Sequence, residues 1–260
     1  MAVDPAQARD ALDKGRFRPV FQPLYSLHTG TVVGVEALTR FTGSVHGPGP
    51  WFDAARTAGI AVELELATAQ RALEAGADVP EHVRLWINFS PDALIDPRTW
   101  ELLATHPVDT LGIELTEQGP PTGWAALRDR CEHLQRAGVH IAVDDVGGSW
   151  ASARTLTSVR PDQIKVDPSV THGLESSGRR VQARRLVTAA RRRGATVVAE
   201  GVETPAQLGH WTRLGADAVQ GFLLAVPSCL EDALTAAPIV GLAQRTSATL
   251  AAATPRATAV

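Results

Sequence analysis

Short apolar runs in this chain repeatedly end in a carboxylate, an amide or a lysine, and this pattern most constrains the fold. A parallel strand buried on both faces has a continuous run of Val, Ile and Leu, so a polar residue marks the strand end. In a parallel barrel the strand ends converge on one face, where such folds carry their chemistry. The residues at these ends are Glu36, Asn88, Glu114, Asp144, Asp145, Lys165, Asp167, Glu200 and Gln220. Because converging acids repel unless cations neutralise them, the pattern predicts a metal-dependent active site.

Two strand-like runs near the N-terminus predict a hairpin. The runs FRPVFQPLYSL (17–27) and TVVGVEALTRF (31–41) are joined only by residues 28–30. A parallel crossover needs a dozen or more residues, so the first strand is expected to run antiparallel to the second. From Val83 onward, strands and helices alternate at the spacing of β-α units. Strands are expected at 83–89, 111–116, 139–144, 162–167, 195–200 and 217–222, and helices at 51–58, 60–77, 98–104, 122–137, 151–158, 178–193 and 204–213.

These elements predict an α/β fold, namely a TIM-like (β/α)8 barrel with an antiparallel first strand. The length of 260 residues fits one such domain. We place the barrel at residues 17–238, after an N-terminal helix or tail in 1–16 and before a disordered Ala/Thr-rich tail at 239–260. The alternative is an open doubly wound sheet, which is disfavoured because no Gly-rich phosphate turn follows the first strand.

The composition predicts a soluble cytoplasmic protein that binds neither membranes nor DNA or RNA duplexes. No apolar stretch approaches the roughly 20 residues of a membrane helix, and the first ten residues lack the apolar region of a signal peptide. Cys131 and Cys229 stand alone, which predicts neither a disulfide framework nor a zinc site. The net charge is −3, and the Arg-rich helix expected at 178–193 is interpreted as a solvated outer helix rather than a nucleic-acid-binding face.

Lys165 is the most informative basic residue. The chain has only two lysines, yet one of them lies in a strand beside Asp167. A lysine offers a compact ammonium where arginine offers a wide fork, so a packing or surface role would have tolerated arginine. Around this lysine, two carboxylates about 4 Å apart would repel by about 4 kcal/mol at an effective dielectric of 20. Oxygen-rich sites of this kind favour Mg²⁺ or Mn²⁺, and a paired Asp144-Asp145 suits two ions that act on a phosphodiester.

With these residues in this order, the chain resembles the EAL domain family of cyclic di-GMP phosphodiesterases. The signature is Glu36-Ala37-Leu38 followed by Arg40, and the resemblance covers residues 17–227 in the family's order. The other matching motifs are QPL (22–24), NFS (88–90), ELTE (114–117), DD (144–145), IKVD (164–167), AEGVE (199–203) and QGF (220–222).

The resemblance implies a barrel with one reversed strand and hydrolysis of cyclic di-GMP to linear 5′-pGpG with two Mg²⁺ or Mn²⁺ ions. It implies metal ligands for the first ion at Glu36, Asn88, Glu114 and Asp144, and for the second at Asp144 and Asp145. Glu200 would orient or deprotonate the attacking water, Lys165 would hold that water, and Glu117 would brace the following loop. The implied contacts to the cyclic dinucleotide are Gln22, Leu24, Leu38, Arg40, Asp167, Glu203 and Gln220. A homodimer is also implied.

The chain departs from the family pattern after the paired aspartates. The usual loop is close to DDFGTGYSSL, whereas residues 144–153 are DDVGGSWASA. A second departure is LLAVP at 223–227, in place of an aromatic-Gly-basic-Pro pattern. These changes keep two alternatives open: a cyclic di-GMP receptor that binds without turnover, and a protein-interaction module that has lost the ligand. The retained Lys165 and Glu200 favour the enzyme, because a receptor needs no activated water.

Overall fold

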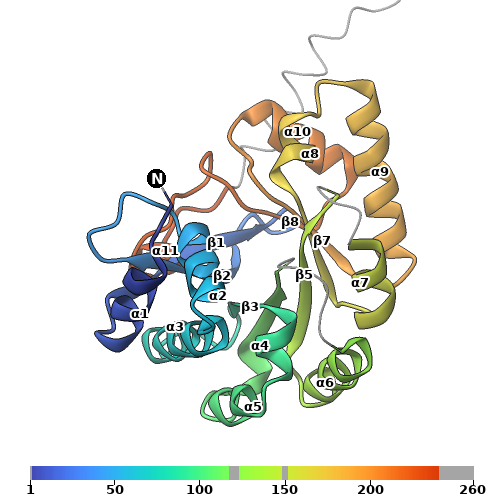
Figure 1. The fold of residues 1–260 in the computed structure, drawn as a ribbon. Helices are drawn as coiled ribbons and strands as arrows, with labels where there is room; N and C mark the ends of the chain where they lie inside the picture. The colour runs from blue at the N-terminus through green and yellow to red at the C-terminus, as the bar shows by residue number, and fades with distance from the viewer. Residues whose placement is uncertain (1, 117–122, 148–151, 240–260) are drawn as a thin grey trace, which may run out of the picture.

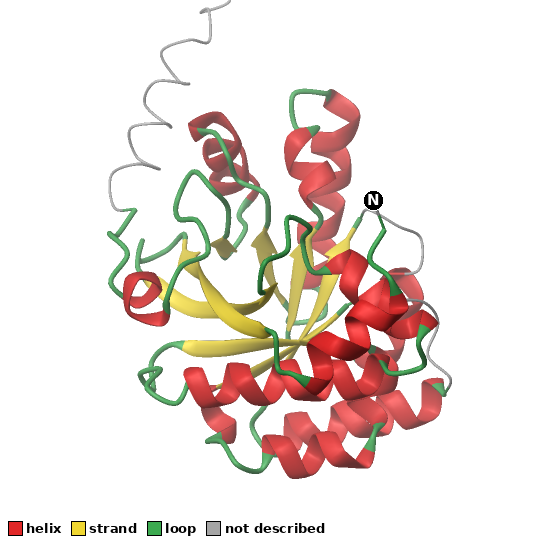
Figure 2. Cartoon of the chain, turned by 60° about the vertical axis from the view of Figure 1, so that its left-hand side comes forward, coloured by secondary structure: helices red, strands yellow, loops and turns green. Residues whose placement is uncertain are grey.

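Eight strands close into a barrel that is surrounded by helices (Figures 1 and 2). The computed structural model describes residues 2–116, 123–147 and 152–239, with side chains from residue 155 in the last range. The strands are β1 (Phe17–Ser26), β2 (Val32–Phe41), β3 (Arg84–Phe89), β4 (Leu111–Leu115), β5 (His140–Val146), β6 (Gln163–Val166), β7 (Thr196–Ala199) and β8 (Ala218–Val219). The predicted (β/α)8 barrel is therefore confirmed.

The helices follow the strands around the outside of the barrel (Figure 1). They are α1 (Pro5–Asp13), α2 (Gly49–Thr57), α3 (Ala61–Ala75), α4 (Pro91–Ile95), α5 (Pro97–Leu103), α6 (Trp124–Arg136), α7 (Ser152–Val159), α8 (Pro168–His172), α9 (Ser177–Arg191), α10 (Pro205–Leu214) and α11 (Leu230–Leu234), with a 3₁₀ turn η1 (Val108–Thr110). None of these helices, within the part of the chain that the structure describes, has the length and apolar character required to cross a membrane.

The first strand is reversed, as the short hairpin connection predicts. β1 pairs antiparallel with both β2 and β8, and every other neighbouring pair is parallel. The β1–β8 pairing closes the sheet, which excludes the open doubly wound alternative. Because β1 is reversed, the early part of this strand lies at the same end of the barrel as the carboxyl ends of the others.

Two short helices that the sequence analysis did not expect begin at strand-end residues. Ser90 accepts a hydrogen bond from the Ala93 N–H at the start of α4, and Asp167 accepts one from the Ser169 N–H at the start of α8. Each cap is followed by proline at the first helical position, where a missing N–H costs nothing. Ser-Pro and Asp-Pro were therefore readable start signals, but five-residue helices are too short to show periodicity.

The predicted last strand, 217–222, was too long, since the ladder of β8 ends at Val219. Gly221 explains this difference. A Cβ atom at residue 221 would lie 2.2 Å from the Val202 carbonyl oxygen, so the chain passes directly against the backbone after β7 and turns there. Gln220 thus stands at the rim of the barrel, just beyond the end of its strand.

The chain beyond the barrel is tied back to the first hairpin. Ser228 exchanges two backbone hydrogen bonds with Phe21, and the N–H of Ile239 donates to the Gly30 carbonyl at 2.8 Å. Ile239 is buried, although the sequence analysis assigned it to a tail. The remainder of that predicted tail, 240–260, lies outside the described residues.

Apolar side chains pack on both the outer and the inner face of the barrel sheet. The outward face of the strands packs under the helices as one large core, which includes Leu85, Ile113 and Val197. The barrel interior has a smaller cluster around Trp86, consisting of Leu24, Ala142, Val198 and Ala218. Two glycines on the strands that flank β3 make room for the indole. A Cβ would lie 2.8 Å from the Trp86 Nε1 at Gly34 and 2.2 Å from the Trp86 Cε3 at Gly112.

We expect Gly112→Ala to destabilise the fold by roughly 1–3 kcal/mol, because the added methyl overlaps the Trp86 ring in a closely packed interior. Chemical denaturation of the two proteins measures the difference. Gly178→Ala is the matched control, since residue 178 lies in α9 and a methyl added there would meet no atom within 4 Å. Its stability should equal or slightly exceed that of the parent. Equal stability of the Gly112→Ala protein would contradict this account of the interior.

Candidate active site

The Lys165 ammonium lies at the centre of the strand-end residues. Its Nζ is 2.7 Å from Glu114 Oε2, 2.8 Å from Glu200 Oε1, 2.9 Å from Glu36 Oε2 and 3.6 Å from Asp144 Oδ1. The lysine side chain is fully buried, and the four carboxylates come from β2, β4, β5 and the end of β7. Residues separated by more than a hundred positions in the sequence therefore meet at one cation.

Amide side chains complete this layer. Asn88 Nδ2 donates to Glu36 Oε1 at 2.9 Å, and Gln220 Nε2 donates to Glu36 Oε2 at 3.0 Å. Gln22 joins the same network, because Gln220 Nε2 lies 3.4 Å from its Oε1 and its own Nε2 donates to the Ala225 carbonyl. Glu36 thus accepts hydrogen bonds from a lysine and two amides, which hold its carboxylate in one position.

The pKa values show that a single cation does not neutralise this layer. Burial raises the pKa of Glu114 well above its usual range, and the neighbouring charge of Glu36 raises it further. Burial, followed by the charge of Asp144, also raises the pKa of Glu200 well above its usual range. Glu36 is the exception: burial opposes its ionisation, but Lys165 and the Asn88 amide together lower its pKa. Protons or further cations are therefore needed to balance Glu114 and Glu200.

The pKa of Lys165 is also raised, and for an amine this favours the charged form. Burial alone would lower the pKa of this amine, but the surrounding carboxylates raise it well above its usual value. The lysine is therefore a fixed positive charge. The resemblance predicted that it would hold a water molecule. Here its Nζ is within 3 Å of three carboxylates, so its first role in this structure is to hold the acids together.

A β-bulge directs Asp144 and Asp145 toward the same mouth. Val143 pairs with Ile164 and Val146 pairs with Val166, so one extra residue lies in β5 between these pairs. Consecutive side chains of a regular strand point to opposite faces, but a bulge re-aims one of them. Asp145 adopts a φ of 53°, which a non-glycine residue rarely takes. As a result, both aspartates line the same two cavities.

The donor set fits hard divalent cations. Carboxylate oxygens of Asp144, Asp145 and Glu200 lie within 4.8 Å of one another, and every donor is oxygen. Within the described residues, Glu114 Oε1 and Asp144 Oδ1 are buried without a hydrogen-bond partner. Buried carboxylate oxygens without a hydrogen bond are costly, and a cation would satisfy them. This cluster differs from the implied ligand sets, because it adds Glu200 while Glu36 and Glu114 are engaged by Lys165.

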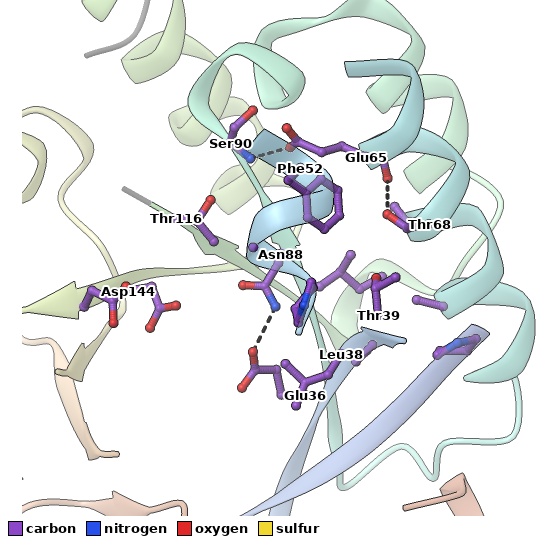
Figure 3. Close-up of a pocket in the computed structure, with 18 residues that line it drawn as sticks. Glu36, Leu38, Thr39, Phe52, Glu65, Thr68, Asn88, Ser90, Thr116 and Asp144 are labelled. Carbon is purple, nitrogen blue, oxygen red and sulfur yellow. Dashed lines mark hydrogen bonds between the residues drawn. The ribbon is translucent and has the colours of Figure 1, made fainter. Parts of the chain in front are cut away.

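Two cavities meet at these acids. The first, of 370 Å³, extends from Glu36, Asn88 and Asp144 toward α2 and α3 (Figure 3). The second, of 350 Å³, extends toward α8 and the segment after β8. Their shared lining consists of Glu36, Leu38, Asp144 and Asp145. The geometry therefore provides one elongated binding region, with the acid cluster at its middle.

The predicted substrate contacts divide into two groups. Gln22, Leu38, Glu203 and Gln220 line the second cavity. Leu24, Arg40 and Asp167 line neither of the two. Leu24 is buried against Trp86 inside the barrel, Arg40 donates from Nη1 to the Thr39 carbonyl, and Asp167 caps α8. Glu117 lies outside the described residues.

The cavities also contain residues that sequence reasoning missed. Glu65 and Phe52 line the first cavity, and His172 and Phe222 line the second. The Glu65 carboxylate accepts a hydrogen bond from the Ser90 N–H at 2.7 Å (Figure 3). An acid next to Leu64 and Leu66 in the apolar part of an expected helix was a usable signal for Glu65. His172 and Phe222 had no signal of this kind.

Comparison with known proteins decides the family. The EAL domain profile matches residues 6–227. The chain belongs to the EAL domain family. It is 29% identical over 242 residues to the cyclic di-GMP phosphodiesterase PdeL of Escherichia coli K12, covering 86% of this chain and 66% of that protein. This chain therefore spans less than two thirds of that relative.

Solved EAL structures have the same fold. The PaMucR phosphodiesterase in complex with c-di-GMP superposes with a TM-score of 0.78 at 26% identity, covering 87% of this chain and 98% of that one. The manganese and c-di-GMP complex of Klebsiella pneumoniae BlrP1 has a TM-score of 0.73 at 29% identity, covering 82% of this chain and 56% of that one. The expected EAL resemblance is thus confirmed, together with its barrel.

We expect Lys165→Met to destabilise the metal-free protein by roughly 3–5 kcal/mol, because it leaves buried carboxylates without their cation. Loss of the cation raises the folded-state pKa of Glu36, which Lys165 lowers in the parent, and raises that of Glu114 further. Stability is then retained at low pH and lost as pH rises through the folded pKa, so urea denaturation should show a larger deficit at pH 8 than at pH 5.

Lys14→Met is the control for this prediction, since Lys14 forms an exposed ion pair with Asp10 and its replacement should change stability far less than that of Lys165. A Lys165→Met/Glu114→Gln protein should recover part of the loss, because one buried charge is removed. A Lys165→Met deficit that is the same at both pH values would contradict the electrostatic explanation.

Glu65 gives a separate pH-dependent prediction. Burial raises the pKa of this carboxyl despite the Ser90 hydrogen bonds, so its ionisation opposes folding as pH rises through the folded pKa. Glu65→Gln keeps an acceptor for Ser90 and cannot ionise. Its stability relative to the parent should therefore increase from pH 5 to pH 8 in urea denaturation. Glu63→Gln, at an exposed position of the same helix, should show no such trend.

Proposed function

We propose that this chain is a cyclic di-GMP-specific phosphodiesterase that hydrolyses one phosphodiester bond and releases linear 5′-pGpG. The main support for the proposal is that two cavities of similar volume meet at a cluster of carboxylates, including Glu200, that surrounds the Lys165 ammonium. A cyclic dinucleotide has two nucleoside halves joined by phosphates, so such a ligand could place a phosphate at the acids and a nucleoside in each direction. Two relatives support the substrate class, namely the cyclic di-GMP phosphodiesterase PdeL and the c-di-GMP complex of PaMucR.

The residues that would hold two Mg²⁺ or Mn²⁺ ions are Glu36, Asn88, Glu114, Asp144 and Asp145, and Glu200 lies in the same cluster as the two aspartates. When bound, two such ions neutralise the phosphate and make a water molecule a better nucleophile. Divalent ions bound at this site would compete with the Lys165 ammonium for the carboxylate oxygens of Glu36 and Glu114. The manganese and c-di-GMP complex of BlrP1 supports Mn²⁺ as one suitable ion.

Glu200 is the proposed general base. Burial and the charge of Asp144 raise its pKa, so the carboxylate, once ionised, is a stronger base than an exposed glutamate. Attack of water on phosphorus breaks the bond between phosphorus and the 3′ oxygen. The water proton passes to Glu200, and the leaving 3′ oxygen takes up a proton, returned by Glu200 or supplied by solvent, to become the free 3′ hydroxyl. Lys165 lies 2.8 Å from Glu200 Oε1 and would stabilise negative charge that develops nearby.

Polar side chains at the second cavity are proposed to recognise a guanine. Gln220 Oε1 is buried without a hydrogen-bond partner among the described residues, although its Nε2 donates to Glu36. A guanine edge has N–H groups that could donate hydrogen bonds to this oxygen. Gln22, Leu38 and Glu203 line the same cavity. Leu24, Arg40 and Asp167 would reach the ligand only after side chains move from the positions described above.

The receptor remains the second candidate, and the altered sequence after Asp145 favours it. Val146 stands where the family usually has an aromatic residue, and it is buried and paired with Val166. A smaller side chain there removes packing beside the bulge, which would slow turnover more than binding. A homodimer stays a prediction.

The test is incubation of the purified protein with cyclic di-GMP and Mn²⁺ or Mg²⁺, followed by chromatographic separation of the products. We expect 5′-pGpG from the parent and a loss of at least about 10²-fold in kcat for Glu36→Gln, because a fixed ligand oxygen becomes a neutral amide. Glu132→Gln, on the exposed face of α6, is the control and should retain activity. Tight binding of intact substrate without product would establish the receptor instead. If the protein neither binds nor hydrolyses cyclic di-GMP, both the phosphodiesterase and the receptor are refuted.

A further inference from the structure

The bulged pair Asp144-Asp145 is held between two attachments. Before the bulge, Val143 pairs with Ile164 of β6. After it, Val146 pairs with Val166, and the Asp167 N–H donates to the Val146 carbonyl at 3.2 Å. Asp145 has a φ of 53°, in the left-handed region that non-glycine residues rarely adopt. Such a conformation persists only where the surrounding contacts enforce it.

The next residue is held from outside the sheet. Gln182 Nε2, on the outer helix α9 (Figure 1), donates a hydrogen bond to the Gly147 carbonyl at 2.9 Å. Gly147 has a φ of 99° and packs closely, since a Cβ there would lie 2.9 Å from Leu186 Cδ1 and 3.2 Å from Val170 Cγ2. α8 and α9 therefore both contact the chain just beyond the paired aspartates.

The orientation of the Gln182 amide is itself fixed. Arg179 Nη1, one turn earlier on α9, donates to Gln182 Oε1 at 2.9 Å. Because a guanidinium can only donate, the amide oxygen must face Arg179 and the NH₂ group must face Gly147. Arg179, Gln182 and Gly147 thus form a hydrogen-bonded chain that ends two residues after Asp145.

We propose that Gln182 is a positioning residue for the metal-binding carboxylates. Its hydrogen bond fixes the exit of the bulge and thereby holds Asp145 in the conformation that places its carboxylate beside Asp144 and Glu200. Without the donor, the bulge relaxes toward negative φ at Asp145 and the carboxylate leaves this group. Asp144 is retained by its position against Lys165, so the ion that depends on Asp145 is affected most. The proposal rests on the proposed function for the identity of the ions.

The test compares Gln182→Met, which keeps the side-chain length but removes the donor, with the parent. Mn²⁺ binding is measured by calorimetry and by electron paramagnetic resonance, without substrate. We expect the Mn²⁺ site that depends on Asp145 to lose affinity by about 10–100-fold, the usual effect of removing a hydrogen bond that orients a ligand. In kinetics, kcat should fall at limiting Mn²⁺ and recover at high Mn²⁺, while KM for cyclic di-GMP changes by less than about 2-fold.

Two further variants separate positioning from general stability. Gln70→Met, where the amide pairs with Glu74 on the exposed side of α3, should bind Mn²⁺ as the parent does. Arg179→Met leaves the Gln182 donor in place but frees its orientation, so it should show a smaller loss than Gln182→Met. Parent-like Mn²⁺ affinities in Gln182→Met, with a lower Tm in both the absence and the presence of Mn²⁺, would overturn the proposal. Mn²⁺ binding by a parent that does not hydrolyse the substrate would refute the enzyme alone, and the effect of Gln182→Met on binding would still decide this inference.

Discussion

The contact between Lys165 and its carboxylates is the interaction on which the rest of this structure depends. Strands β2, β4 and β5 and the end of β7 each bring an acid to the barrel mouth, and their mutual repulsion opposes closure of the sheet. One buried ammonium within 3 Å of Glu36, Glu114 and Glu200 offsets part of that repulsion. The raised pKa values of Glu114 and Glu200 show that the mouth is still receptive to more positive charge.

Below this charged layer the barrel is apolar, and the two layers have different tasks. Trp86 and its neighbours fill the interior, where Gly34 and Gly112 leave space for the indole. A rigid floor of this kind limits how far the polar side chains above it can move. The bulge in β5 then adds what regular strand geometry cannot provide, namely two adjacent carboxylates that face one mouth.

The sequence was sufficient for most of the fold because the signals were local and repeated. Continuous apolar runs that end in polar residues identify the strands, and the three-residue link at 28–30 determines the direction of β1. Polar strand ends also predicted which acids meet. Leu24 lay beyond this reasoning: its motif places it beside Gln22, but strand alternation and depth put it against Trp86. The competition of Lys165 for metal ligands was equally invisible, since it depends on distances between four elements. Glu65 and His172 enter the cavities through the packing of α3 and α8, which no short motif encodes.

The reversal of β1 has a consequence for where this domain ends. The ladder that joins β1 to β8 contains only two residue pairs, Tyr25–Val219 and Ser26–Ala218, so the cylinder has a short seam. The segment after β8 is hydrogen-bonded to the β1–β2 hairpin beside this short ladder. The Ala225 carbonyl accepts from Gln22, Ser228 exchanges backbone hydrogen bonds with Phe21, and the Ile239 N–H donates to the Gly30 carbonyl. Truncation of the chain after β8 would therefore remove these hydrogen bonds and leave the short β1–β8 pairing without their support. The backbone contacts of the barrel with the segment after β8 therefore include residues well past the final strand, among them Ile239.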